Sequence, residues 1–362
     1  MPPSSKTDIS QLDRIHGMFL GTAVGDSLGL PAEGLTPQRI RRWYGEDWQQ
    51  RLIGSWGMVS DDTDHTVFLA QSLIQHPNNS DRFVRRLARS LRWWLVGLPP
   101  GIGFGTLRAI AKLWLGISPH KSGIFTAGNG PAMRIAPIGA MFSHDAEKLE
   151  HYVKISTRLT HTDPKATTGA LAIARTIARI FQKEQADPPP LKDWIEEIRQ
   201  CGSNDTEWQN QMDVLEQCFD KDESVQNLAI AMGLPQGVTG YMYHTVPVAL
   251  YAWYRHFGDF ATTLTNTLSC GGDTDTTGAI VGALAGATVG ASAIPQEWYS
   301  SIKDWPHNPN YLRKLSKQFA QVCKTQQPGF VLRRLPLGVP LRNMAQLMIV
   351  LYHGFRRLLP PY

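Results

Sequence analysis

Residues 278–294, GAIVGALAGATVGASAI, constrain the fold of this chain more than any other stretch. They form its most apolar window, yet most of them are glycine or alanine. The window is only about as long as the shortest membrane-spanning helices, ~17 residues, and small side chains favour insertion into a bilayer only weakly. Small side chains do let a helix approach its neighbours closely. The window therefore predicts a tightly packed core helix, and we prefer this interpretation to a membrane span.

Helical spacing of apolar residues recurs along most of the chain. The stretch DRIHGMFLGTAVGDSLG, residues 13–29, carries apolar residues at intervals of three and four, and so does TDHTVFLAQSLIQH, residues 63–76. In DPKATTGALAIARTIARIFQ, residues 163–182, Asp163 is the expected N-cap and Pro164 takes the first helical position. Segments with strand-like alternation are scarce. The pattern predicts an all-α fold, a compact single-domain bundle of orthogonal helices with long loops at one end.

The chain is expected to have three parts. An N-terminal extension covers residues 1–12, one domain covers 13–325, and a basic, apolar helical extension covers 326–362. No acidic residue follows Asp304, and the last 58 residues carry nine Lys or Arg. This tail either packs on the more acidic body, which we favour, or makes peripheral contact with an anionic membrane. The basic charge is too weak and too scattered to indicate nucleic-acid binding.

Cysteine usage and the N-terminus bear on the compartment. The four cysteines are scattered and show no CxxC spacing, which argues for reduced thiols and against a disulfide framework or a zinc site. The N-terminal segment MPPSSKTDIS lacks the basic and then apolar regions of a secretory signal. We therefore expect a cytoplasmic protein.

Acidic residues gather at two places where the apolar spacing predicts the start of a helix. Asp61 and Asp62 form one group, and Asp273 and Asp275 form the other, directly before the apolar window. Each group can serve as a helix cap, because carboxylates accept hydrogen bonds from the free N–H groups of a first turn. One Asp suffices for a cap, however, and like charges repel unless a cation lies between them. The two groups together predict a hard divalent ion such as Mg²⁺, Mn²⁺ or Ca²⁺.

A glycine-rich segment, TAGNGPAMR at residues 126–134, places Gly128, Asn129 and Gly130 before a helical stretch. Glycine lets main-chain N–H groups approach a phosphate closely at the start of a helix. A plain turn explains an isolated GNG as well. The phosphate-binding interpretation therefore depends on the acidic groups elsewhere in the chain.

Taken in order, the segments GTAVGDSLGLPAE, SDDTD, GNGPAMR, LTH and GGDTDT resemble those of the ADP-ribosylglycohydrolase family, from about residue 13 to about residue 295. The resemblance implies two Mg²⁺ or Mn²⁺ ions in a cleft of an all-α domain. It implies hydrolysis of the bond between ADP-ribose and an acceptor, typically an arginine of an ADP-ribosylated protein. The implied metal ligands are Ser60, Asp61 and Asp62 on one side and Asp273, Asp275 and Thr276 on the other.

The same resemblance assigns further roles. Catalysis falls to Glu33, Asp61, Asp62 and Asp275, with Glu33 as a gating or proton-transferring residue. Asp26 and Asp64 are expected behind the metal ligands. For two of the implied substrate contacts, His161 and Tyr241, the residues alone also allow simple core packing. The implied substrate contacts are Gly128, Asn129, Gly130, Met133, His161 and Tyr241.

One departure from the family pattern falls in LPPGIGFGTLRAI, residues 98–110, where many arginine-specific members carry an Asp in the place of Gly101. Without that carboxylate, either Glu33 or an Asp of the two acidic groups transfers the proton in catalysis, or the bond that is cleaved does not join ADP-ribose to arginine. The alternatives are a hydrolase for ADP-ribose linked to serine, to nucleic acid or to a small molecule, and a non-catalytic module that binds ADP-ribose.

Overall fold

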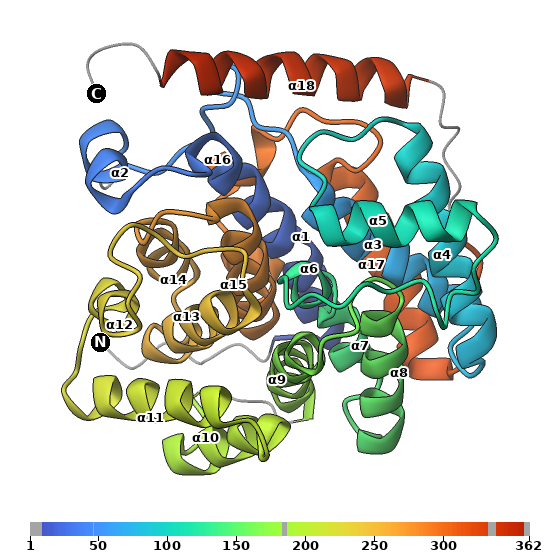
Figure 1. Cartoon of the computed structure of the whole chain (residues 1–362), viewed down its shortest axis with the longest axis horizontal. Helices are drawn as coiled ribbons and strands as arrows, with labels where there is room; N and C mark the ends of the chain where they lie inside the picture. Colours follow the sequence, from blue (N-terminus) through green and yellow to red (C-terminus); the bar gives the residue numbers. More distant parts are fainter. Residues whose placement is uncertain (1–8, 46, 183–186, 332–337, 358–362) are drawn as a thin grey trace.

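The structure, a computed structural model, describes residues 9–45, 47–182, 187–331 and 338–357. Over these ranges the chain forms eighteen α-helices and three short 3₁₀-helices, and its only strand-like pairing consists of isolated bridges (Figure 1). The all-α prediction is confirmed. The α-helices are α1 (Gln11–Gly29), α2 (Pro37–Trp43), α3 (Asp61–Gln75), α4 (Ser80–Val96), α5 (Phe104–Trp114), α6 (Gly130–Met133), α7 (Ala136–Met141), α8 (Ala146–Arg158), α9 (Pro164–Gln182), α10 (Leu191–Arg199), α11 (Thr206–Asp220), α12 (Val225–Ala231), α13 (Met242–Arg255), α14 (Phe260–Leu268), α15 (Thr274–Val289), α16 (Gln296–Ser300), α17 (Pro309–Thr325) and α18 (Val339–Arg356).

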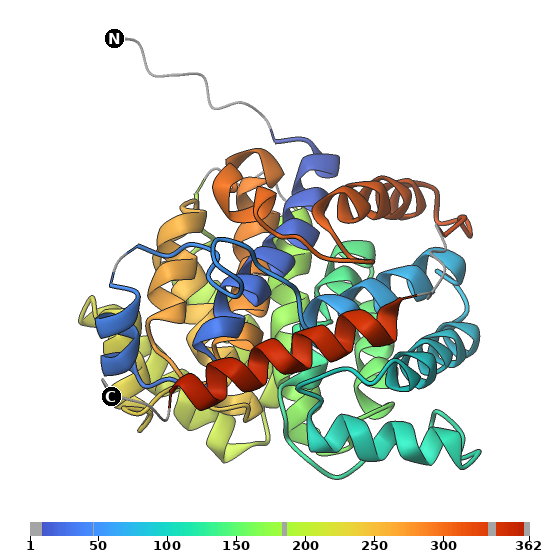
Figure 2. The same ribbon diagram turned by 90° about the horizontal axis from the view of Figure 1, so that it is seen from above.

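Helices α1 and α15 lie antiparallel against each other at the centre of the molecule (Figures 1 and 2). A Cβ atom added to Gly21 would lie 2.1 Å from the carbonyl oxygen of Gly282, and one added to Gly25 would lie 2.0 Å from that of Gly278. The two main chains therefore touch, which only glycine permits at these positions. All 16 residues of α15 are buried, so the prediction of a core helix is confirmed. The described part of the chain contains no helix with the length and hydropathy that a membrane crossing requires.

Three helix ends meet at one end of this pair. The last residue of α1, Gly29, packs against the main chain of Thr274 at the start of α15. The start of α3 joins them because the Asp26 carboxylate of α1 accepts hydrogen bonds from the main-chain N–H groups of Ser60, at 2.9 and 3.0 Å, and Thr63, at 3.2 Å. Asp26 thereby satisfies free N–H groups in the first turn of α3. Two acidic groups that are far apart in the sequence are brought together in this way.

The other predicted helices are also present. Helix α9 begins at Pro164, and the side chain of Asp163 accepts a hydrogen bond from the Lys165 N–H at 3.0 Å, as expected for a residue before the first turn. Helix α1 begins at Gln11, close to the predicted domain boundary. Residues 1–8, in the predicted N-terminal extension, and residues 183–186 lie outside the described residues.

Helix α18 crosses the outer surface of the helical body and is held there by polar side chains (Figure 2). Arg342 forms an ion pair with Asp304, whose carboxylate also accepts a hydrogen bond from the Val59 N–H at 2.9 Å. Arg342 and Gln346 donate to the Val59 carbonyl at 2.7 and 2.9 Å. Val59 directly precedes the first acidic motif, so α18 holds the chain that leads into it.

The C-terminal end of α18 reaches a second part of the same region. Arg357 donates hydrogen bonds to the main-chain carbonyl of Glu33 and, at 2.8 Å, to that of Pro31. His353 lies 2.8 Å from the carbonyl of Leu52. One helix therefore contacts both the segment before α3 and the turn after α1. Residues 332–337 and 358–362 of the predicted C-terminal extension lie outside the described residues.

Candidate active site

A cavity of about 540 Å³ lies where the ends of α1, α3 and α15 meet. Its lining draws on the turn after α1, the start of α3, the loops before α5, α6 and α13, and the start of α15. Ser60, Asp62 and Tyr241 are not part of this lining. The predicted site residues that line it are Glu33, Asp61, Gly128, Asn129, Gly130, Met133, His161, Asp273, Asp275 and Thr276.

Asp62 connects the two acidic motifs from behind the cavity wall. It is 1% exposed, and its Oδ2 accepts hydrogen bonds from the hydroxyls of Ser60, at 3.0 Å, and Thr276, at 3.4 Å. Its other oxygen, Oδ1, is buried and has no hydrogen-bond partner in the structure. A buried carboxylate oxygen without a partner is costly. A cation beside it would remove that cost.

The acids around the cavity disfavour one another's charged forms. Burial raises the pKa of Asp61, Asp62 and Asp275 well above that of a free carboxylic acid, and the charges of neighbouring acids raise these pKa values further. Burial and then the charge of Asp273 raise the pKa of Glu33, whereas the nearby Arg357 lowers it. Carboxylates in such surroundings either take up protons or bind cations.

The donor set at this site suits hard divalent cations. Within the described ranges, no three His, Cys, Asp or Glu side chains converge tightly enough to hold an ion as they stand. The side chains that face one another across the motifs nevertheless offer carboxylate and hydroxyl oxygens, which Mg²⁺, Mn²⁺ and Ca²⁺ prefer. The unpartnered Oδ1 of Asp62 adds one oxygen that no protein group satisfies. On these observations the residues fit metal ions of this class.

Asn129 ties the GNG segment to the second acidic motif. Its side-chain Nδ2 donates to Asp273 Oδ2 at 2.7 Å and to the Thr245 hydroxyl at 3.0 Å. Its main-chain N–H donates to the Gly240 carbonyl at 2.9 Å. Asn129 is therefore a residue that positions Asp273, and the neighbouring Gly128 and Gly130 form the open part of the loop.

His161 is buried beside that loop, with its imidazole edge against the glycines. A Cβ atom on Gly128 would lie 3.1 Å from His161 Nε2, and one on Gly130 would lie 3.2 Å from its Cε1. The other ring nitrogen, Nδ1, lies 2.8 Å from the Thr160 hydroxyl. Burial and then the charge of Arg134 lower the pKa of His161 to about 3, so the ring is neutral. Since His161 lines the cavity, the structure places it at the site and not only in the core.

Arg134 is a site residue that sequence reasoning missed as an individual position. It is fully buried and donates to the Gly130 carbonyl at 3.1 Å, the Ser156 carbonyl at 3.1 Å and the Thr160 hydroxyl at 2.7 Å. It thus fixes the glycine loop and, through Thr160, the ring of His161. The sequence signal that could have identified Arg134 was its position at the end of the GNGPAMR segment.

Tyr241 lies apart from the cavity. Its hydroxyl donates to Glu207 at 2.7 Å and accepts from Lys165 at 3.0 Å, so the side chain belongs to a polar cluster on the neighbouring surface. Its main chain forms an isolated bridge with Gly128. Tyr241 therefore supports the glycine loop through its main chain.

Gly101 lies in the cavity lining. Its φ of +77° is one that residues other than glycine adopt at a cost, and no atom lies within 4 Å of the position that its Cβ would take. Phe104 and Thr106 from the same segment also line the cavity, and Phe104 is 83% exposed. This segment of the cavity lining therefore carries no carboxylate.

Comparison with known proteins gives one family. The model of the ADP-ribosylglycohydrolase family matches residues 7–329. An uncharacterized protein of Archaeoglobus fulgidus is 32% identical over 319 residues, covering 86% of this chain and 99% of that protein. The ADP-ribosyl-[dinitrogen reductase] glycohydrolase of Rhodospirillum rubrum is 29% identical over 299 residues, covering 80% of this chain and 90% of the relative.

Two further matches extend the comparison. The human ADP-ribosylhydrolase ARH3 is 25% identical over 352 residues, covering 85% of this chain and 94% of the relative. A solved structure described as an ADP-ribosylglycohydrolase-related protein complex superposes with a TM-score of 0.61 at 26% identity, covering 86% of this chain and 99% of that chain.

Proposed function

Because the chain belongs to the ADP-ribosylglycohydrolase family and is a hydrolase of that family, we propose that it removes ADP-ribose from a protein side chain, with arginine as the first candidate acceptor. The observation that carries the proposal is the meeting of both acidic motifs and the GNG segment around one cavity of about 540 Å³. That size suits a ligand larger than a simple metabolite. The names of two relatives, a glycohydrolase and a hydrolase acting on ADP-ribosyl groups, support the same reaction class.

In the proposed centre, two Mg²⁺ or Mn²⁺ ions would be held by Ser60, Asp61 and Asp62 from one motif and by Asp273, Asp275 and Thr276 from the other. Such ions, when bound, supply Lewis acidity, orient ribose hydroxyls and acidify a bound water molecule. The unpartnered Oδ1 of Asp62 and the raised pKa values of Asp61 and Asp275 support this assignment, because each is relieved by a nearby cation.

Residues of the chain stabilise charge, transfer the proton and contact the substrate. Carboxylates around the cavity stabilise the positive charge that develops at C1″ of the distal ribose when its bond to the acceptor weakens. Glu33 lines the cavity and its pKa is raised by burial, so it can carry a proton to the leaving group or from the attacking water. The Nε2 atom of the neutral His161 ring can donate a hydrogen bond to a ribose or phosphate oxygen, or accept one from a ribose hydroxyl.

A second candidate function differs from the first in the acceptor to which ADP-ribose is linked. Gly101 and Phe104 form a wall without a carboxylate where arginine-specific members carry one. This wall favours an acceptor that needs no ion pair there, such as serine, a nucleic acid that carries ADP-ribose or a small molecule. A non-catalytic module that binds ADP-ribose is the third possibility.

One assay separates these candidates. Release of free ADP-ribose is measured from arginine-, serine- and nucleic-acid-linked substrates with Mg²⁺, with Mn²⁺ and with EDTA, for the native chain and for Asp275→Asn. Metal-dependent release that Asp275→Asn abolishes supports the hydrolase and identifies its acceptor. Release unaffected by EDTA rules out the metal centre, and tight binding of ADP-ribose without release on any substrate leaves the binding module.

We also propose a cytoplasmic location. All four cysteines are unpaired in the structure, which suits a reducing compartment. Fractionation of the native cells with an antibody to the chain tests this directly.

A further inference from the structure

Helix α18 turns several polar side chains to the helical body and a row of large apolar side chains to the outside, although one apolar residue, Ile349, packs inward against Leu30, Leu52 and Met58. Asn343 donates to the Gly97 carbonyl at 2.7 Å and Gln346 to the Val59 carbonyl at 2.9 Å, and both side chains are buried. Arg342 and His353 also contact the body from this inner face. This orientation differs from the usual arrangement, in which a surface helix turns most of its apolar side chains inward.

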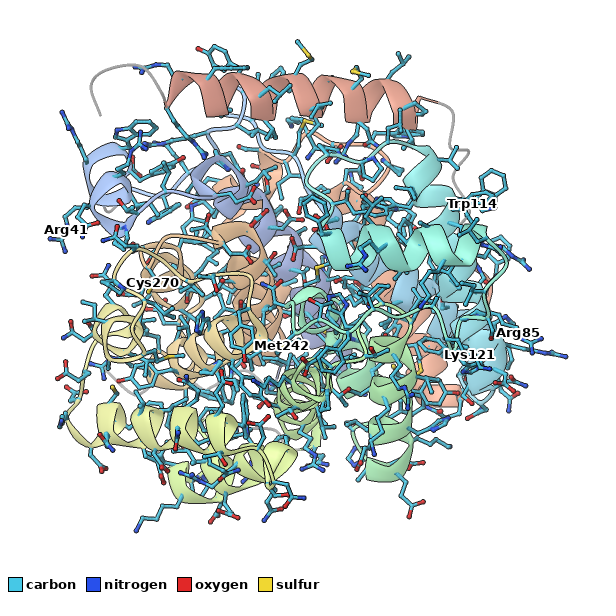
Figure 3. All side chains as sticks on the ribbon, viewed as in Figure 1. Arg41, Arg85, Trp114, Lys121, Met242 and Cys270 are labelled. Carbon is cyan, nitrogen blue, oxygen red and sulfur yellow. The ribbon has the colours of Figure 1, made fainter. Side chains whose placement is uncertain are left out.

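The outer face carries a continuous apolar stripe, and Figure 3 shows side chains projecting from α18 away from the rest of the molecule. Exposure is 78% at Leu341, 61% at Met348 and 67% at Phe355. Residues 341, 344, 348, 351 and 355 follow one another at intervals of three, four, three and four. This is the spacing of the seam along which two helices pack. The outer stripe comprises Leu341, Met344, Met348, Leu351, Tyr352 and Phe355.

We propose that the outer stripe is the contact between two copies of this chain, with the two α18 helices antiparallel about a twofold axis at Met348. In that arrangement Leu341 faces Phe355 of the second copy, Met344 faces Tyr352 of the second copy, and the two Met348 side chains meet. The stripe is therefore complementary to itself, as a twofold contact requires. It lies beyond residue 329, outside the region that the family model matches.

The exposed area is of the size that a stable dimer uses. A whole aromatic side chain contributes roughly 150–250 Å², so the six side chains at their observed exposures offer on the order of 700 Å² per copy. A standard protein interface takes about 800 Å² from each partner. A helix of 18 residues, ~27 Å long, is long enough to carry such a contact. Exposed apolar patches of this size mark interaction surfaces.

A second helix fits the stripe better than a membrane does. Helices that lie on anionic membranes carry Lys and Arg on the polar face, where these side chains meet lipid headgroups. On α18 the polar face is turned into the protein, and Arg342 is paired with Asp304. No Lys or Arg occurs between Arg342 and Arg356, so most of the stripe has no basic partner for anionic lipid.

Light scattering after size-exclusion chromatography tests the proposal on the full chain at ~1 to ~100 µM, a range that brackets micromolar association. The native chain is expected at twice 40.3 kDa. Met348→Glu places two carboxylates face to face on the axis and should weaken dimerisation by at least about 100-fold. Leu115→Glu, at an exposed apolar residue beyond the end of α5 and away from α18, is the control and should remain dimeric.

A charge pair makes the test independent of folding defects. Met348→Lys should also be monomeric, and an equal mixture of Met348→Glu with Met348→Lys should recover the dimer mass. A monomeric native chain, or dimers in both Met348→Glu and its Lys counterpart, would overturn the proposal. A monomeric native chain that floats with phosphatidylcholine–phosphatidylserine vesicles, and loses this in Met348→Glu, would assign the stripe to a membrane and overturn the dimer.

Discussion

Asn129 and Asp273 are joined by a hydrogen bond of 2.7 Å between Nδ2 and Oδ2, although 144 residues separate them in the sequence. The bond makes the glycine loop and the second acidic motif one unit. Asn129 carries no charge and lies 8% exposed, so its amide orients the carboxylate without neutralising it.

Removing this amide should disturb the metal centre more than the fold. Asn129→Ala releases Asp273, and loss of an orienting partner behind a ligand typically lowers metal affinity or activity about 10–100-fold. Titration of Mn²⁺ and ADP-ribose release both measure the effect. Asn227→Ala, at an exposed asparagine of α12, is the control. Unchanged Mn²⁺ affinity and rate in Asn129→Ala would show that Asp273 does not need this partner.

Gly21→Ala should destabilise the whole chain. The new methyl group would lie 2.1 Å from the Gly282 carbonyl oxygen, so α1 and α15 must move apart. Overpacking of this kind typically costs about 1–3 kcal/mol and occasionally more, and urea unfolding measures the loss. Gly354→Ala provides the matched control, because no atom lies within 4 Å of its Cβ position in α18. That control should be neutral or slightly stabilising, since alanine favours helix. Equal stability of the two variants would contradict the close contact.

Arg342→Ala should loosen α18 and the chain before α3 together. It leaves the Asp304 carboxylate, which is 0% exposed, without its ion-pair partner. Breaking a buried pair on one side costs about 3–5 kcal/mol. Thermal and urea unfolding measure the loss, and Arg356→Ala at the exposed end of the same helix should change stability by less than about 0.5 kcal/mol. Similar losses in both variants would mean that Asp304 does not depend on Arg342.

The stability of the chain should fall below pH 6.5 partly through His65. Burial, and then the charge of Arg134, lower the pKa of His65 from the ordinary 6.5 to about 3. Between these values the unfolded chain binds a proton that the folded chain does not, so stability is present above pH 6.5 and is lost as the pH decreases. The contribution is up to about 1.4 kcal/mol per pH unit.

His65→Phe tests this contribution. Both ring nitrogens of His65 are buried without hydrogen-bond partners, and the ring packs 4.5 Å from that of Trp94, so phenylalanine leaves no polar atom unsatisfied. Urea unfolding between pH 7.5 and 4.5 should show a smaller loss of stability in the variant than in the native chain. Parallel pH profiles would mean that His65 takes up its proton over the same pH range in the folded and the unfolded chain.

The sequence predicted local structure well where one physical signal dominates. Apolar spacing located α1, α3 and α9, and the small-residue window located the buried α15. The predicted site residues account for ten of the 21 residues that line the cavity. Clustered acids were the strongest signal, because like charges repel unless a cation lies between them.

Contacts between distant elements were harder to predict. Asp26 caps α3 from another helix, and nothing in the spacing of GDSLG indicates which N–H groups its carboxylate meets. Arg134 acts through main-chain carbonyls, which every sequence provides. The sequence predicted a basic, apolar helical extension over residues 326–362, but not which face of its helix turns inward. That choice depends on the carbonyls of Val59 and Gly97, which are free to accept.

The main-chain contact between α1 and α15 also limits how the protein can move. Sliding one helix along the other would drive carbonyl oxygens into neighbouring Cα atoms at each glycine in turn, so shear at this contact is blocked. The acidic residues at its end therefore keep their spacing during a catalytic cycle. Adaptation to different substrates must come from parts of the wall that are not anchored to this pair, such as the segment from Gly101 to Thr106.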